Sequence, residues 1–248
     1  AGGLTAGFHA ASSRFRSIAA VEMDPEAAAS YRATFPKTDV YAGAIQDWLA
    51  EGTIPTDVDV VVGGPPCQGF STLGKRDAED ARNRLWEQYA QVIQRARPKY
   101  FVVENVPAFG KSPQYRDFLA ATGPGEFLED YSFDFRILNA ADYGAPQARR
   151  RAVLIGHRYD MAVPGFPEPT HSPDGGRDLL PYRTVRQTLL GVPAQPDMDE
   201  RFDQLRTRVG SRRVPGAFSP RELHVSRGYS PKSRERFAAI PEGGNRAD

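Results

Sequence analysis

The sequence predicts an α/β protein built on a mostly parallel sheet. Short apolar runs alternate with helical patterns across residues 1–156, and this alternation is typical of strands joined by helices. Two of the runs, VDVVV at 58–62 and YFVVE at 100–104, are apolar almost without a break, as buried parallel strands are. A helical pattern lies between these two runs and completes the strand–helix–strand signature.

Local signals place the individual elements. Residues 17–22 (SIAAVE) predict a strand, and Asp24-Pro25-Glu26 then supplies an N-cap, a first-turn proline and an acidic first turn. The helix that starts there is expected to run to about Phe35. Two late strands are expected at 133–138 and 152–156, on either side of a loop. A second helix ends before Pro98, and its apolar face comprises Leu85, Tyr89, Val92, Ile93 and Ala96.

The composition changes after Tyr159. Residues 161–176 are rich in proline and glycine, which favours a surface loop, so we expect a catalytic domain over 1–159 and a loop-rich basic segment over 160–248. Residues 1–140 carry 14 basic and 18 acidic side chains, whereas residues 141–248 carry 18 and 13. The stretch 206–236 holds nine basic residues against two acidic ones, which suits either a phosphate backbone or a solvated basic surface.

Several classes of protein are disfavoured by the bulk sequence. The chain has one cysteine, so it forms no internal disulfide and no zinc site built on several thiolates. No stretch approaches the ~18 apolar residues of a membrane span, and AGGLTAGFHA does not read as a signal peptide. We therefore expect a protein of a reducing, intracellular setting that binds neither a membrane nor a metal.

The strongest chemical signal is the loop GGPPCQGFS at 63–71, which directly follows the strand VDVVV. Ligands of open α/β sheets bind just beyond the carboxyl ends of the strands. A lone cysteine is more often a buried small hydrophobe. A stiff loop of two glycines and two prolines at a strand end instead holds the thiol of Cys67 outward, and this favours a nucleophile.

Two further motifs follow strands or lead into them. Glu104, in ENV at the end of YFVVE, is expected beside the Cys67 loop if the two strands are neighbours, and a carboxyl group in a partly dry pocket can supply a proton. The alternative is a carboxylate that only caps a loop or helix. In QARRR at 147–151, strand alternation places Arg149 and Arg151 on one face. Such a pair can bind a phosphate, a base edge or a carboxylate, although adjacent arginines are usually solvated surface.

A weaker signal lies at the start of the chain. Gly2 and Gly3 form a glycine-rich turn, and Glu22 ends a strand about twenty residues later. Nucleotide-like cofactors are held in this way, because glycines admit the ligand and the carboxylate accepts the ribose hydroxyls. Two glycines alone are weak support, and the spacing to Glu22 strengthens the interpretation.

Together and in this order, AGGL, VEMD, GGPPCQGFS, RNRLW, FVVENV and DYGAPQARRR resemble the bacterial DNA cytosine-5 methyltransferases. The resemblance covers nearly the whole chain, and the combination of PPCQ, ENV and Q-x-R-x-R is highly specific. The tail, with His224 and IPEGGN at 240–245, resembles the family segment just before the variable target-recognition domain.

The resemblance implies a Rossmann-like domain that binds S-adenosylmethionine and methylates C5 of cytosine in double-stranded DNA, within a restriction-modification or orphan methylation system. It implies Cys67 as the nucleophile, Glu104 at N3 of the flipped cytosine, and Arg149 and Arg151 as the basic pair, with Arg151 nearer the base. Glu22 matches the ribose-binding acid and Met23 the residue against the adenine. The implied cofactor-binding residues are Gly2, Gly3, Leu4, Glu22, Met23, Ile45, Pro65 and Leu85. The implied substrate-binding residues are Pro66, Gln68, Ser71, Asn105 and Gln147.

The sequence departs from the family pattern in three places. The aromatic residue and first glycine of the cofactor motif are absent, and Ala44 stands where the family usually has an acidic residue. The target-recognition domain and the two closing motifs are also absent. We therefore expect a chain truncated at both ends that is monomeric when complete, or is completed by a separate C-terminal segment.

Two other functions fit the same motifs. One is a tRNA cytosine-5 methyltransferase of the same fold, which the context Gly69-Phe70-Ser71 after PPCQ disfavours. The other is a non-catalytic fragment or subunit, which Ala44 and the absent ends favour and the intact Cys67, Glu104 and arginine pair disfavour.

Overall fold

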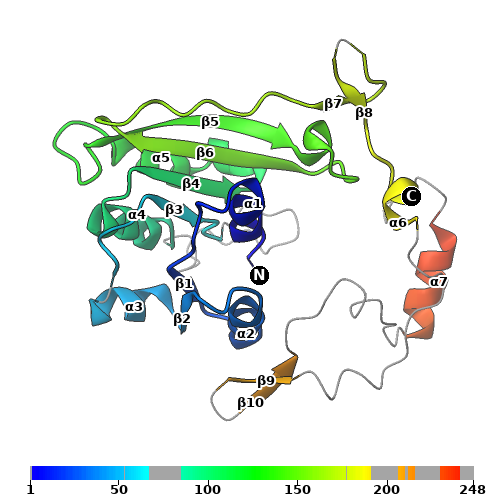
Figure 1. The fold of residues 1–248 in the computed structure, drawn as a ribbon, viewed down its shortest axis with the longest axis horizontal. Helices are drawn as coiled ribbons and strands as arrows, with labels where there is room; N and C mark the ends of the chain where they lie inside the picture. Colours follow the sequence, from blue (N-terminus) through cyan, green and yellow to red (C-terminus); the bar gives the residue numbers. More distant parts are fainter. Residues whose placement is uncertain are drawn as a thin grey trace.

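The computed structural model of the chain describes residues 2–52, 54–66, 85–176, 178–190, 206–209, 212–215 and 230–240. A four-stranded sheet with the order β3–β4–β6–β5 lies at its centre (Figure 1). Strand β3 (Val60–Gly63) pairs in parallel with β4 (Tyr100–Asn105), which pairs antiparallel with β6 (Arg150–Arg158). Strand β6 also pairs antiparallel with β5 (Tyr131–Asn139).

This sheet is mixed, whereas the sequence predicted a mostly parallel one. Strands β5 and β6 follow each other along the chain. A short loop over 140–149 joins them and reverses the direction of the chain. A parallel connection needs a crossover of a dozen residues or more, so this loop can join only antiparallel strands. The α/β class itself is confirmed, because helices and strands alternate along the chain up to β5.

A second, two-stranded parallel sheet comes from the start of the chain. It pairs β1 (Ala19–Glu22) with β2 (Asp39–Ala42). Helix α2 (Pro25–Thr34) connects these strands, and the carboxylate of Asp24 accepts the amides of Glu26 and Ala27 at its N-cap, as the sequence predicted. Helix α1 (Gly3–Ala11) crosses α2, where the hydroxyls of Thr5 and Tyr31 lie 2.7 Å apart.

Helices α4 (Leu85–Ala96) and α5 (Pro113–Ala120) cover one face of the central sheet. The main core lies between them and the strands, and burying each of its large side chains contributes about 1.5–3 kcal/mol. Helix α3 (Ile45–Glu51) extends this layer toward β1 and β2 through Trp48 and Leu49. The largest side chains of the main core that are fully shielded from solvent are Phe101, Phe109, Phe118, Ile93, Leu128 and Leu154.

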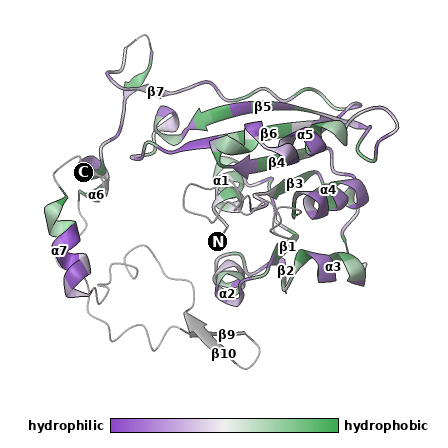
Figure 2. Cartoon of the chain, turned by 180° about the vertical axis from the view of Figure 1, so that it is seen from behind, coloured by the Kyte–Doolittle hydropathy of each residue, from purple (hydrophilic) through white to green (hydrophobic). Residues whose placement is uncertain are grey.

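The chain beyond β6 runs back along the outer edge of β5 before it forms short elements (Figure 1). These are β7 (His171–Ser172), β8 (Leu180–Pro181) and α6 (Val185–Leu189). Farther on lie the hairpin of β9 (Arg206–Val209) and β10 (Arg212–Pro215) and the helix α7 (Pro231–Ala239). Most of α7 is coloured as hydrophilic in Figure 2. The division of the chain at residue 159 stays a prediction.

Most of the predicted elements are present with small shifts at their ends. The predicted strands correspond to β1, β3, β4, β5 and β6, and the two predicted helices to α2 and α4. Sequence analysis did not predict α1, β2, α3 or α5. Strand β2 (DVYA) begins with a charged residue and lacks the continuous apolar run by which β3 and β4 were predicted.

Candidate functional site

Strands β3 and β4 end, and β6 begins, at one edge of the central sheet (Figure 1). In the ladder, Gly63 lies opposite Val103, and Glu104 lies opposite Val153. The loop that leads to Cys67 and the ENV motif therefore leave the sheet side by side, as expected if the two strands are neighbours.

Strand alternation separates the two polar residues of ENV. Along β4, Phe101, Val103 and Asn105 are buried against the helical layer, whereas Glu104 is only partly buried. Consecutive side chains of a strand point to opposite faces. Glu104 therefore lies on the more open face of the sheet, and Asn105 lies on the covered face.

An ion pair joins Glu104 to the arginine motif. The Nε atom of Arg151 lies 2.7 Å from Oε1 of Glu104, and the two side chains are 24% and 36% exposed. Arg151 precedes Val153, the direct partner of Glu104, by two residues, so the pair bridges β4 and β6 diagonally on the open face. A pair with this exposure is screened less than one on the open surface, yet a ligand can still reach it.

Gly64 brings the start of the loop against the same carboxylate. A Cβ atom at Gly64 would lie 3.1 Å from the carbonyl oxygen of Glu104 and 3.3 Å from its Oε2 atom. The backbone comes this close because glycine has no side chain. Pro65 and Pro66 follow at once, whereas Cys67, Gln68 and Ser71 lie outside the described residues.

The preceding glycine has a different role, which sequence analysis missed. The buried ring of Tyr89 occupies the space beside Gly63, where an added Cβ would lie 2.5 Å from Cε2 of that ring. The hydroxyl of Tyr89 donates to the carbonyl oxygens of Val61 and Val102, at 3.2 and 3.0 Å. Burial raises the pKa of Tyr89, so the neutral hydroxyl stays a donor that spans β3 and β4 beneath the loop.

Replacing Gly63 with alanine is expected to lower the free energy of unfolding by about 1–3 kcal/mol, the usual cost of overpacking. The Tyr89 ring cannot move aside without breaking its two hydrogen bonds to strand carbonyls. Gly7→Ala is the matched control, since a Cβ there meets nothing within 4 Å and Gly7 lies inside α1. Urea unfolding followed by circular dichroism measures both. A midpoint for Gly63→Ala equal to that of wild type would refute this packing argument.

Asn105 fixes the position of the loop. Its Nδ2 atom donates to the carbonyl oxygen of Pro65 at 2.9 Å, and its Oδ1 atom accepts the amide of Val106 at 2.8 Å. The residue is 6% exposed. Sequence analysis placed Asn105 among the substrate-binding residues. The structure instead engages both of its polar atoms with backbone, because alternation turns this side chain to the covered face.

Comparison with known proteins identifies the family. The family model for C-5 cytosine-specific DNA methylase matches residues 1–204. The chain belongs to this family.

Curated relatives support the assignment. The methylase chain is 35% identical over 271 residues to the Type II methyltransferase M.XorII of Xanthomonas oryzae pv. oryzae, a match that covers 97% of this chain and 60% of that protein. It is also 35% identical over 215 residues to M.AquIA of Picosynechococcus sp., which covers 78% of this chain and 86% of that one. The chain thus spans about 60% of the length of M.XorII.

A solved structure supports the fold. The chain superimposes, with a TM-score of 0.58 and 22% identity, on an E. coli protein described as a prophage-encoded DNA modification methyltransferase. The match covers 90% of this chain and 68% of the other. At this identity the likeness concerns the fold alone, and it confirms the predicted Rossmann-like methyltransferase architecture.

The other two residues that the Q-x-R-x-R motif specifies, Gln147 and Arg149, are exposed. Arg149 lies just before β6, where its carbonyl oxygen accepts the amide of Ala140 at 2.9 Å. Gln147 lies two residues earlier in the same loop and is also exposed. Of the predicted arginine pair, Arg151 is therefore the one that the structure brings to Glu104.

Two groups of the residues predicted to bind the cofactor lie at opposite ends of α2. Glu22 ends β1, where its Oε1 atom accepts the amide of Asp24 at the start of α2, and the neighbouring Met23 is 68% exposed. Gly2, with a left-handed φ of 85°, packs at the opposite end of α2, where an added Cβ would lie 2.6 Å from Phe35. A Cβ at Gly3 would meet open space. Their joint role in cofactor binding stays a prediction.

The remaining predicted cofactor residues are placed as follows. Ile45 begins α3 and packs against the apolar cluster beneath it, and Leu85 begins α4 and is partly buried. Leu4 lies in the first turn of α1 and is exposed. Ala44 is the N-cap of α3 and offers no side-chain hydrogen bond to the helix amides, as an acidic residue there would.

Proposed function

We propose that the protein transfers a methyl group to C5 of cytosine in DNA through a covalent adduct at Cys67, as part of a bacterial restriction-modification or orphan methylation system. Family membership supports cytosine and DNA as the substrate class. The observation that carries the proposal is the Glu104–Arg151 pair at the strand edge, where Gly64 starts the loop that contains Cys67.

The chemistry of cytosine explains why a thiol is needed. C5 is a poor nucleophile, and addition of the Cys67 thiolate at C6 moves electron density onto it. The Sγ–C6 bond forms as the C5–C6 double bond opens. C5 then takes the methyl group, and the electron pair of the broken sulfur–methyl bond stays on the sulfur of the donor. Loss of the C5 proton to water and cleavage of the Sγ–C6 bond restore the aromatic ring and the thiolate. The cytosine must leave the base stack for this reaction, at a cost of a few kcal/mol.

Glu104 and Arg151 act on the base in this proposal. The Glu104 carboxyl group bonds or protonates N3, which stabilises the ring while Cys67 is attached. Arg151 lies within hydrogen-bond distance of Glu104, so it orients that carboxyl group and donates to the same base. Asn105 holds Pro65, two residues before Cys67, through a hydrogen bond to its carbonyl oxygen.

The methyl donor that fits the family is S-adenosylmethionine, which supplies an activated methyl group on sulfur when bound. Two features at the end of β1 suit such a ligand. The Glu22 carboxylate can accept ribose hydroxyls, and the exposed Met23 can cover an apolar ring. Pro65, Ile45, Leu85 and the Gly2–Leu4 turn remain further proposed contacts.

The proposed partner is double-stranded DNA, and the proposed location is the bacterial cytoplasm at the nucleoid. The matches to DNA methylases favour DNA over tRNA. Within the described ranges no helix is both long and apolar enough to cross a membrane. The same ranges contain no group of three or more His, Cys, Asp or Glu residues suited to hold a metal ion.

Alone, the 248-residue chain is expected to bind DNA weakly and without sequence preference, and to methylate it poorly. The nine basic residues of 206–236 supply phosphate binding, which weakens steeply with salt and carries no sequence information. Adding the part of M.XorII that the match leaves uncovered is expected to increase methyl incorporation. The measurement is tritiated methyl transfer into mixed-sequence DNA, with nucleoside analysis of the product. Label in any base other than cytosine, or site-specific methylation by the chain alone, would contradict the proposal.

A further inference from the structure

The loop over 140–149 that carries Gln147 and Arg149 into β6 contacts a part of the chain that the mechanism does not use. This part comprises residues 167–176 and 178–182 with strands β7 and β8, and we name it the brace. It lies at the end of the sheet where β5 finishes and β6 starts (Figure 1).

Asp142 is the point where the brace and the loop meet. Its Oδ1 atom accepts the hydroxyl of Tyr182 at 2.5 Å and the Nδ2 group of Asn139 at 3.0 Å. Its carbonyl oxygen accepts the amide of Thr170 at 2.9 Å. Asp142 is thus held through its side chain by Tyr182, which follows β8, and by Asn139, the last residue of β5. Its backbone is held by Thr170, which precedes β7.

Packing adds to these hydrogen bonds. His171 in β7 is 8% exposed, and its ring lies over Gly144, where an added Cβ would be 2.7 Å from Cε1. Gly144 has a φ of 86°, so the loop turns sharply at this point. The Nδ1 atom of His171 is paired with the Thr170 hydroxyl at 2.8 Å, and Tyr143 donates to the carbonyl oxygen of Pro167 at 3.1 Å.

The position of Asp142 determines the position of the backbone at the start of β6. Ala140 donates to the carbonyl oxygen of Arg149, and Arg150 pairs with Asn139, so the first turn of the loop is in register with the start of β6. Arg151 is the next residue, and it reaches Glu104. A shift at Asp142 therefore moves the backbone that carries Arg149 and Arg151.

The geometry points to Tyr182 and Asp142 as positioning residues that hold the arginine loop in register with Glu104. This inference rests on the proposed function for its effect on catalysis, but not for its effect on the loop. The hydrogen bond to the Asp142 carboxylate raises the pKa of Tyr182, so its hydroxyl stays protonated and donating across the neutral range. Bonds to charged acceptors are the stronger kind.

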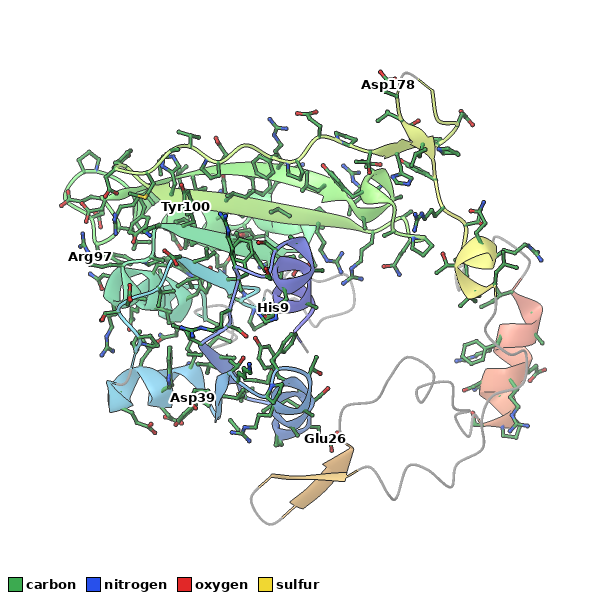
Figure 3. The ribbon with its side chains drawn as sticks, in the orientation of Figure 1. His9, Glu26, Asp39, Arg97, Tyr100 and Asp178 are labelled. Atoms are coloured by element: carbon green, nitrogen blue, oxygen red, sulfur yellow. The ribbon has the colours of Figure 1, made fainter. Side chains whose placement is uncertain are left out.

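Hydrogen exchange followed by mass spectrometry tests the effect on the loop. Tyr182→Phe removes one hydroxyl and is expected to speed exchange about tenfold in peptides covering 140–151, with β4 unchanged. Asp142→Ala should act at least as strongly, whereas Asp142→Asn keeps an acceptor oxygen and should recover part of the protection. Tyr100→Phe is the matched control, because its hydroxyl donates to Ala162 at the other end of the same connecting chain. Figure 3 labels Tyr100 and, in the turn of the brace, Asp178 at opposite ends of the sheet.

A second readout separates positioning from mere folding. In protein supplied with the part of M.XorII that the match leaves uncovered, Tyr182→Phe should slow adduct formation with saturating 5-fluorocytosine DNA and leave the apparent DNA affinity within about twofold. If wild type forms no adduct, the proposed function fails. The exchange rates still decide whether the brace holds the loop over 140–149. If exchange in 140–151 of Tyr182→Phe matches that of wild type and of Tyr100→Phe, the proposal that the brace holds this loop is refuted. Faster exchange with an unchanged adduct rate would overturn the positioning role.

Discussion

In protein supplied with the part of M.XorII that the match leaves uncovered, replacing Cys67 with serine is expected to abolish the covalent complex that the proposed mechanism predicts with DNA containing 5-fluorocytosine. The fluorine at C5 cannot leave as the proton does, so the Sγ–C6 adduct accumulates in wild type and resists denaturing electrophoresis. A serine hydroxyl is far less acidic than a thiol and does not form the required nucleophile at neutral pH. The expected loss is on the order of 100-fold or more.

The single cysteine makes this experiment clean, because no other thiol in the 248 residues can substitute. Alkylation of wild type with iodoacetamide should block trapping in proportion to the thiol lost, and unfluorinated DNA should give no stable complex. Circular dichroism of Cys67→Ser checks that the fold survives. A complex that persists in Cys67→Ser would show that another group attacks the base.

The sequence predicted the central part of the site because its signals are local. Buried strands at 58–62 and 100–104 are continuous apolar runs, and each is followed at once by its motif. If those strands are parallel neighbours, Glu104 must lie beside the loop of Cys67. The structure confirms the pairing of β3 with β4 and the approach of Gly64 to Glu104.

What the sequence did not reveal depends on contacts between distant residues. Gly63 is required by the ring of Tyr89, which is 26 positions later and was predicted only as part of a helical core face. Asp142 meets Tyr182 across 40 residues of chain. Period-two alternation at the end of this strand does predict that the carboxylate of Glu104 and the amide of Asn105 serve opposite faces, but sequence analysis did not use it. The pairing of Glu104 with Arg151 further required the antiparallel register of β6, which a mostly parallel sheet does not provide.

Glu104→Gln is expected to slow methyl transfer by about 10²–10⁴-fold, the range that positioned acid–base groups contribute. The neutral amide can still accept from Arg151 at the present 2.7 Å position, so the diagonal contact and the fold should largely survive. It cannot carry the negative charge or the proton that N3 requires. The measurement is single-turnover transfer from tritiated S-adenosylmethionine, in protein supplied with the part of M.XorII that the match leaves uncovered, beside a separate binding titration of the cofactor.

The decisive quantity is the ratio of the two losses. A residue that acts at the base lowers the transfer rate and leaves cofactor affinity within about twofold, because only the transition state has lost an interaction. Glu129→Gln is the matched control, since this carboxylate accepts the amide of Gly125 in an exposed turn and should leave both quantities unchanged. Equal losses of transfer and of cofactor binding in Glu104→Gln would instead place Glu104 in the cofactor site. In that case the ion pair with Arg151 would serve to close that site and not to bind cytosine.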